Sequence, residues 1–254
     1  MAKRSGYGFG IVGCGMVADF HAKAIAAMKG GHLACVFSRS RKNAERVAKT
    51  HECAVYTDYS QFLAHPGLDI VTIATPSGAH LEPIQKAAKA GKHIVCEKPL
   101  EITLERIDKM IHTCKQNKVM LAGIFQRRFY EAVGVFKKAV EVGRLGKITL
   151  ADAYIKWYRT QEYYDSGYWR GTWKLDGGGA LINQSIHTID LLYYLAGDVD
   201  WVCAFADRAI HKQIEAEDNA VAILKFKNGA MGVIEGSTSC YSPGGHPAEV
   251  HMCG

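Results

Sequence analysis

The fold is decided by the stretch Tyr7-Gly-Phe-Gly-Ile-Val-Gly13-Cys-Gly15-Met-Val-Ala18. A short β run leads into the pattern Gly-x-Gly-x-x-Ala, and an amphipathic helix pattern follows at residues 17–28. Gly13 permits a tight turn, Gly15 lets a pyrophosphate approach the backbone, and Ala18 allows close packing of helix on strand. Because a helix N-terminus carries free N–H groups and partial positive charge, the stretch predicts a dinucleotide-binding unit. The alternative is a glycine-rich turn without a ligand.

Strand and helix patterns alternate through the first half of the chain. The expected strands are residues 7–12, 33–37, 69–74, 92–96 and 119–124, and the expected helices are residues 17–28, 42–50, 79–90 and 103–117. Strands joined by helices of this length form a parallel sheet with helices on both faces. We therefore predict an α/β fold whose first part, residues 1–124, is a doubly wound Rossmann domain that binds the dinucleotide.

The pattern changes after about residue 124. Helices are expected at residues 129–142 and 177–195, an antiparallel strand at residues 147–158, and a hairpin around Asn228-Gly229. These elements predict an α+β domain at residues 125–254 with an open, mainly antiparallel sheet. The last residues resemble the start of another strand, which would leave an exposed sheet edge. We therefore expect a truncated chain and an incomplete second domain.

Composition excludes several classes of protein. The 254 residues are 48% hydrophobic and 22% charged, unlike a disordered chain. The net charge of +6 comes from scattered residues rather than a basic stripe, so no nucleic-acid partner is expected. No apolar run approaches the ~20 residues that span a bilayer, and residues 1–5 lack the apolar core of a signal peptide. The eight cysteines are dispersed without a C-x-x-C pair, which favours reduced thiols in a cytoplasmic protein and no metal site.

The end of the second expected strand addresses the choice of cofactor. It reads Phe37-Ser38-Arg39-Ser40-Arg41, without the carboxylate that binds the ribose 2′-hydroxyl of NAD. Arg39 can pair bidentately with a 2′-phosphate, and Ser38 can donate a hydrogen bond to it. The pattern therefore favours NADP over NAD. The alternative is that Arg39 stacks on the adenine, which leaves NAD open.

Two further motifs carry candidate chemistry. Lys98, in Glu97-Lys98-Pro99, follows an apolar strand and is expected at the carboxyl edge of the sheet, where ligands bind in such folds. A lysine there can donate a proton or hydrogen bond to a carbonyl or alcohol, although an isolated lysine in a turn is often only solvated. Asn183 and His187 are four residues apart in a helical pattern, so they are expected on one helix face.

Taken together, the motifs resemble the glucose–fructose oxidoreductase/inositol dehydrogenase (Gfo/Idh/MocA) family of NAD(P)-dependent sugar oxidoreductases. The resemblance covers nearly the whole chain. It is carried by residues 13–18, Thr75-Pro76 with His80, Glu97-Lys98-Pro99, and Gly177-Gly178-Gly179 through His187. It implies a Rossmann domain followed by an α+β domain whose open sheet often mediates oligomerisation, with the nicotinamide near Lys98.

The resemblance also implies site residues. Lys98 corresponds to the catalytic lysine and His187 to the catalytic histidine, while Asn183 stands where many members have Asp. Because Asn cannot take a proton, proton transfer would depend on His187 and Lys98. The expected catalytic residues are therefore Lys98, His187 and Asn183, and the expected cofactor contacts are Gly13, Gly15, Ala18, Ser38, Arg39, Thr75, Pro76, His80, Glu97 and Gln126. The expected substrate contacts are Lys98, Arg127, Tyr158, Trp173, Asn183 and His187.

Several of these assignments have competing interpretations. His80 is expected either to lie near the cofactor ribose or to make a structural hydrogen bond. Gln126 and Arg127 contact ligands or begin a solvated basic helix. Tyr158 and Trp173 offer flat faces to a sugar ring, or belong to a packed loop core or a subunit interface. Asp190 orients the imidazole of His187, or caps or pairs structurally.

The expected function is hydride transfer between a nicotinamide cofactor and a secondary alcohol or ketone of a sugar or cyclitol. Its partners would be the small-molecule substrate and further copies of the chain, with no membrane or nucleic acid. One alternative is a redox-neutral glycosidase that holds NAD, oxidises the sugar transiently and restores the hydride. Another is a non-catalytic nucleotide-binding relative.

Overall fold

The computed structural model describes residues 6–254, so the basic N-terminus lies outside the described residues. The chain divides into two compact units, Met1–Ile124 and Phe125–Gly254. Within the described part of the chain, every helix is too short or too polar to cross a bilayer.

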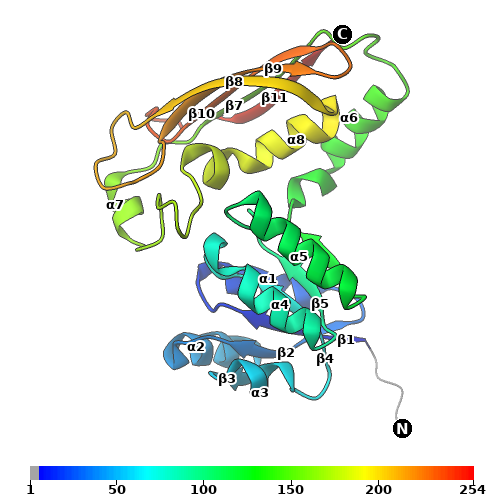
Figure 1. Cartoon of the computed structure of the whole chain (residues 1–254), viewed down its shortest axis with the longest axis vertical. Helices are drawn as coiled ribbons and strands as arrows, with labels where there is room; N and C mark the ends of the chain where they lie inside the picture. Colours follow the sequence, from blue (N-terminus) through cyan, green and yellow to red (C-terminus); the bar gives the residue numbers. More distant parts are fainter. Residues whose placement is uncertain (1–5) are drawn as a thin grey trace. The chain divides into compact units, whose positions relative to one another are not determined.

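The first unit contains a six-stranded parallel sheet with the order β3-β2-β1-β4-β5-β6 (Figure 1). Its strands are β1 Tyr7–Val12, β2 Gly31–Phe37, β3 Ala54–Tyr56, β4 Leu68–Ile73, β5 His93–Cys96 and β6 Leu121–Gly123. Its helices are α1 Met16–Ala27, α2 Arg41–His51, α3 Tyr59–Leu63, the 3₁₀ turn η1 Ser77–Ala79, α4 Leu81–Lys89 and α5 Leu104–Gln116. The predicted doubly wound fold is confirmed, and β3 and α3 are additional short elements.

Helices cover both faces of this sheet because each presents an apolar stripe to it. On one face, α1 packs through Ala18, Ala22 and Ile25, which recur at intervals of four and three residues. On the other face, α4 and α5 enclose a core that includes Ile84 and Met110, both fully buried. Strand order reverses between β1 and β4, and in such sheets ligands bind outside the carboxyl ends of the strands at this point.

The second unit contains a five-stranded sheet with the order β11-β7-β10-β9-β8. Its strands are β7 Leu150–Lys156, β8 Val199–Asp207, β9 Asn219–Phe226, β10 Met231–Ser237 and β11 Ala248–Cys253. Its helices are the 3₁₀ turn η2 Gln126–Phe129, α6 Glu131–Glu141, α7 Gln161–Asp165, the π-helix η3 Ala180–Ser185 and α8 Ile186–Ala196. The sheet is mainly antiparallel, as predicted, but β7 runs parallel to β10 and antiparallel only to β11.

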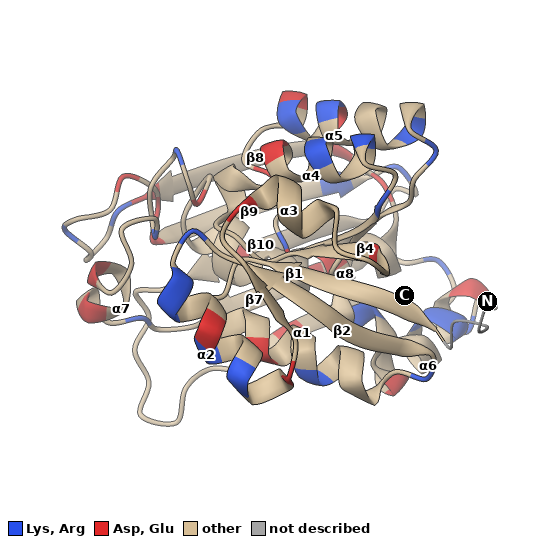
Figure 2. Cartoon of the chain, turned by 90° about the horizontal axis from the view of Figure 1, so that it is seen from below, with Lys and Arg blue, Asp and Glu red and all other residues tan. Residues whose placement is uncertain are grey.

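Helix α8 lies along one face of the second sheet (Figure 1). Burial alternates strictly along β9, and its inward residues Ala222, Leu224 and Phe226 share a core with Leu192 and Ala196 of α8. The outward residues of β9 are exposed, as is nearly all of β8. In Figure 2, basic and acidic segments are interspersed along the outer helices rather than gathered by sign.

The predicted helix at residues 177–195 needs correction. Gly177 to Gly179 lie outside it, the segment begins as a π-helix, and only residues from Ile186 onward form a regular α-helix. The same-face argument for Asn183 and His187 assumed α-helical spacing, which does not hold through the wider turn. π-turns are often found at functional sites, and this one contains the expected site residue Asn183.

Candidate active site

The glycine turn lies at the reversal point of the first sheet. Gly13 has a φ of +97°, and a Cβ there would lie 2.6 Å from the carbonyl oxygen of Ala74, so both backbone conformation and space require glycine. The N–H of Gly13 donates to the carbonyl of Phe37, and the N–H of Ala74 donates to that of Val12. These bonds fix the turn against both neighbouring strands.

Gly15 is required for a different reason. It is the N-cap of α1 with an ordinary φ of −77°, it has no side chain to cap the helix, and a Cβ there would meet no protein atom within 4 Å. The space in front of the helix N-terminus is therefore open, while Ala18 is fully buried one turn further on. The open helix end, its N–H groups and its dipole fit a pyrophosphate, so these residues fit a bound dinucleotide.

Arg46 of α2 braces this turn, which the sequence analysis missed. Its guanidinium bonds the Asp19 carboxylate at 2.7 Å and approaches the carbonyls of Cys14 and Gly15 at 3.4 and 3.3 Å. The hydrogen bond from Arg46 holds the pKa of Asp19 below its usual value, against a smaller opposing effect of burial. The glycine turn thus keeps its shape through side chains from two helices.

The end of β2 leaves Arg39 available. Ser38 accepts a hydrogen bond from the N–H of Ser40, which in turn caps α2 by accepting from Asn43. Arg41 pairs with Glu45 at 2.8 Å. Arg39 is exposed, and no carboxylate among residues 6–254 forms an ion pair with it. Of the two arginines, Arg39 therefore has the free charge for a ligand.

Lys98 follows β5 beside an ionised carboxylate. Glu97 accepts a hydrogen bond from the backbone N–H of Lys98 at 3.1 Å, and its other oxygen lies 2.9 Å from His21 of α1. Burial alone would raise the pKa of Glu97, but the hydrogen bond and charge of His21, with the N–H and charge of Lys98, outweigh it and lower the pKa. Glu97 thereby links the cofactor-side helix to the lysine, whose bond to Pro99 is cis.

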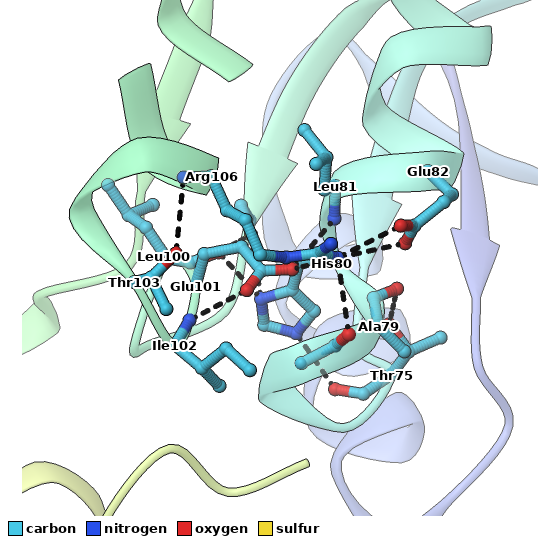
Figure 3. Close-up of polar contacts among 12 residues, drawn as sticks. Thr75, Ala79, His80, Leu81, Glu82, Leu100, Glu101, Ile102, Thr103 and Arg106 are labelled. Atoms are coloured by element: carbon cyan, nitrogen blue, oxygen red, sulfur yellow. Dashed lines mark hydrogen bonds and ion pairs between the residues drawn. The ribbon is translucent and has the colours of Figure 1, made fainter. Parts of the chain in front are cut away.

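His80 is placed inside the protein rather than on a ligand surface (Figure 3). Its side chain is almost fully buried, and its two ring nitrogens lie 3.0 Å from the carbonyl of Leu100 and 2.9 Å from that of Thr75. The ring therefore joins the loop after β4 to the loop after β5. This geometry favours the structural hydrogen bond over a direct contact with the cofactor ribose.

A buried carboxylate anchors the loop that follows Lys98 (Figure 3). Glu101, with a fully buried side chain, accepts hydrogen bonds from the backbone of Leu81 and Ile102 and from Arg106 at 2.8 Å. Arg106 also bonds Glu82 at 3.0 Å. Thr103 is the N-cap of α5, since its side chain accepts from the N–H of Arg106. Glu101 and Arg106 were not singled out from the sequence.

In the second unit, Glu217 fixes the start of the π-helix. Its carboxylate accepts from the N–H groups of Gly179 and Leu181 at 3.0 and 2.9 Å, and its carbonyl accepts from Ala180. A Cβ at residue 179 would lie 1.7 Å from that carbonyl oxygen, so only glycine fits this approach. The glycine run therefore allows the close approach of Glu217 and is not part of the helix.

Asn183 is held by a carboxylate that the sequence pattern did not reveal. Its amide nitrogen donates to Asp176 at 2.5 Å, and its amide oxygen accepts from Gln184 at 3.2 Å. Asp176 is almost fully buried and also accepts from the N–H of Gly171. A carboxylate therefore stands beside position 183, although the residue at 183 cannot take a proton itself.

His187 is half-buried in α8, with its ring edge-on to Phe125 at 6.2 Å. Asp190 forms a bidentate pair with Arg128 at 2.7 and 2.5 Å, which is the structural pairing considered as the alternative.

The remaining expected contacts are dispersed. Arg127 donates to Thr188 and lies 5.0 Å from the centre of the Trp157 ring, whereas Gln126 is exposed in η2. Tyr158 lines a cavity of about 420 Å³, and Trp173 is 56% exposed and does not line it. The expected cofactor residues other than Gln126 thus belong to the first unit, and Asn183, His187 and Arg127 lie around the start of α8.

Comparison with known proteins gives a consistent picture. The family profile described as "Oxidoreductase family, NAD-binding Rossmann fold" (GFO_IDH_MocA) matches residues 7–125, and the "GFO/IDH/MocA C-terminal domain" matches residues 135–252. Myo-inositol 2-dehydrogenase of Thermotoga maritima is 30% identical over 241 residues, covering 90% of this chain and 67% of that protein. Scyllo-inositol 2-dehydrogenase (NAD(+)) of Bacillus subtilis is 30% identical over 250 residues, covering 96% and 70%.

Solved structures agree with the sequence comparisons. The WlbA dehydrogenase from Bordetella pertussis, in complex with NADH and UDP-GlcNAcA, matches with a TM-score of 0.93 and 34% identity. The match covers 98% of this chain and 76% of that one.

The two glycines of the turn provide a matched test of dinucleotide binding. Gly15→Val should leave the Tm of the ligand-free protein nearly unchanged, because a Cβ there would meet no protein atom within 4 Å. It should weaken NADH binding by about tenfold or more, since the side chain occupies the pyrophosphate position. Gly13→Val should lower the Tm itself, because its Cβ meets a carbonyl oxygen at positive φ. Calorimetric unfolding and NADH titration measure both effects; undiminished NADH binding by Gly15→Val would place the cofactor elsewhere.

Proposed function

The chain belongs to the GFO/IDH/MocA oxidoreductase family, and on that basis we propose that it is a dehydrogenase or reductase of sugars or cyclitols. The reaction is hydride transfer between a nicotinamide dinucleotide and a secondary alcohol or its ketone. The observation that carries the proposal is the open N-terminus of α1 behind the Gly13–Gly15 turn, on the same sheet edge as Lys98. The inositol dehydrogenases and the sugar-bound WlbA dehydrogenase among its relatives support the substrate class.

Each candidate catalytic residue has a separate task in this proposal. The bound nicotinamide supplies the hydride acceptor. The imidazole of His187 takes the proton of the substrate hydroxyl, and the ammonium of Lys98 donates a hydrogen bond to the developing oxyanion. Glu97 keeps the lysine charge in place, because its ionised carboxylate attracts it. Asn183 hydrogen-bonds a substrate hydroxyl from a position that Asp176 and Gln184 fix.

The two proposed proton-handling residues can be tested with matched controls. Lys98→Ala and His187→Ala should each lower kcat by about 10²–10⁴-fold while NADH still binds, because general acid–base assistance is lost. Lys89→Ala and His112→Ala, which replace exposed residues of the first unit, should have normal kcat. Turnover with a panel of inositols and hexoses, followed at 340 nm, provides the measurement. Normal turnover in both site variants would remove the assignment, and release of free aglycone without net NADH would favour the glycosidase alternative.

The choice between the two nicotinamide dinucleotides is a finer proposal. The family description and the NADH bound to the WlbA dehydrogenase support NAD(H). At the end of β2 this chain nevertheless has Ser38 and an exposed Arg39, without an ion-pair partner in residues 6–254, in place of a ribose-binding carboxylate. We propose on this ground that NADP is preferred.

Replacing Arg39 separates the two cofactors. Arg39→Ala should weaken NADPH binding by about tenfold or more and leave NADH binding nearly unchanged, because only NADPH carries the 2′-phosphate. Lys49→Ala, which removes an exposed charge from α2, is the control for general electrostatics. Fluorescence titrations with both cofactors decide the point. Tighter binding of NADH by the unmodified protein would overturn the NADP preference.

The uncovered face of the second sheet suits a further copy of the chain. Residues that are paired across neighbouring strands point to the same face of a sheet. Two such pairs, Phe205 with Val221 and Val233 with Ile223, lie on the face away from α8. Phe205 is 83% exposed, and the apolar residues Trp201, Val221, Ile223 and Met231 are about half exposed around it. Patches of this kind mark protein interfaces, so we propose that the chain associates through this sheet.

A charge placed on that face should prevent association. Phe205→Asp should convert the oligomer to a monomer in light scattering coupled to size exclusion, because burial would desolvate an unpaired carboxylate. Leu104→Asp, at an equally exposed apolar residue of the first unit, should leave the mass unchanged. A monomeric unmodified chain at micromolar concentration would contradict the proposal.

A further inference from the structure

A cavity of about 420 Å³ in the second unit has an unusual lining. Its charged side chains are all basic or potentially basic, namely Lys156, Arg159 and His246, and none of the described residues that line it is acidic. Tyr158 and Tyr241 form its aromatic wall, with ring centres 5.3 Å apart and the rings nearly perpendicular. A cavity with one sign of charge concentrates ligands of the other sign.

The charge of Arg159 is the part of this lining left for a ligand. Lys156 is neutralised by Glu235 at 2.6 Å. Arg159, in contrast, donates to the amide oxygen of Gln184 at 2.8 Å, and no carboxylate in residues 6–254 forms an ion pair with it. Its Nε is buried without a hydrogen-bond acceptor among the described residues, which is an unfavourable state for a charged group.

A second arginine in the same condition lies over the same aromatic ring. The guanidinium carbons of Arg159 and Arg170 lie 5.2 and 4.5 Å from the centre of the Tyr163 ring. Arg170 donates to Ser166, has a buried Nε without an acceptor, and, within the described part of the chain, has no carboxylate partner. Cation–π contacts stabilise each arginine, and two like charges at one ring, neither with a carboxylate partner among residues 6–254, attract an anion.

Hydrogen bonds connect these arginines to the candidate catalytic segment. Gln184, which accepts from Arg159, donates to the hydroxyl of Tyr163 at 2.9 Å and to the amide oxygen of Asn183 at 3.2 Å. An anion held by Arg159 would therefore lie one side chain away from the network that positions Asn183. This connection allows one ligand to place its anionic group at Arg159 and a hydroxyl at Asn183.

We propose that this cavity binds an anionic group of the substrate, so that the substrate is an acidic sugar carrying a carboxylate or a phosphate. The inference rests on the proposed function for the reaction itself and adds the substrate's charge. A guanidinium matches both oxyanions through paired N–H donors, and the Tyr158–Tyr241 wall offers an apolar face to an attached ring.

Matched sugars and variants test the proposal by binding as well as by turnover. The probes are glucose (neutral), glucuronate (carboxylate only), UDP-glucose (phosphates only) and UDP-glucuronate (both). At least one acidic probe should bind the cofactor-loaded protein about 10- to 100-fold more tightly than glucose in calorimetric titration. Arg159→Gln should abolish that difference without changing the affinity for glucose, and Arg159→Lys should retain part of it. Arg144→Gln, at an exposed arginine of the same unit, should behave like the unmodified protein.

Each outcome decides between defined alternatives. The carboxylate-only and phosphate-only probes identify which oxyanion the cavity takes. If Arg159→Gln folds poorly, Arg170→Gln provides a second test, because Arg170 shares the Tyr163 ring with Arg159. Equal affinities for acidic and neutral sugars, or equal losses for both in the variants, would overturn the proposal in favour of a packing role. Arginine-dependent binding of an acidic sugar without any redox turnover would sustain this inference while refuting the proposed function.

Discussion

The structure of the candidate site depends on the contact between His21 and Glu97. Glu97 stands at the end of β5, and His21 belongs to the helix that begins at the glycine turn, so their 2.9 Å contact joins the two parts of the first unit that a dinucleotide enzyme must hold together. The same carboxylate accepts the N–H of Lys98 and attracts its charge. One ionised side chain thereby sets both the cofactor-side helix and the proposed oxyanion-binding lysine.

Buried polar groups extend this arrangement along the sheet edge. His80 joins the loops after β4 and β5 through two carbonyls, and Glu101 joins the second loop to α4 and α5. A buried carboxylate that lost its hydrogen-bond donors would be strongly unfavourable. The Glu101 carboxylate therefore fixes the positions of Arg106 and of the two backbone N–H groups that donate to it. The loop that carries Lys98 is consequently part of the packed body of the unit.

The sequence was sufficient to predict the features that are determined by residues close together in the chain. The Gly13 turn, the alternating strands and helices and the Asn228-Gly229 hairpin all have local signals, and each has its counterpart in the structure. Strand β8 was missed because its residues are exposed on nearly every position and show no alternation. The parallel pairing of β7 with β10 was missed because alternating hydrophobicity along a strand indicates which side chains are buried but not the direction of the neighbouring strand.

The partners of the site residues were beyond sequence reasoning for the same reason. Arg46 reaches Asp19 across 27 residues, Glu217 reaches Gly179 across 38, and neither spacing has a local pattern. Asp176 is only seven residues from Asn183, yet it meets that amide only because Gly177 to Gly179 turn the chain outside a helix. Charges that are paired over long separations become visible only in the folded chain.

The π-helix at Ala180–Ser185 affects how related sequences should be aligned. A π-turn contains one residue more than an α-turn closes, so a single-residue deletion between Gly179 and His187 would restore a regular helix. Every side chain before the deletion would then rotate about the helix axis relative to the imidazole, and the amide at 183 would leave Asp176. Homologues that lack this extra residue therefore have a different geometry even where the letters of the motif agree.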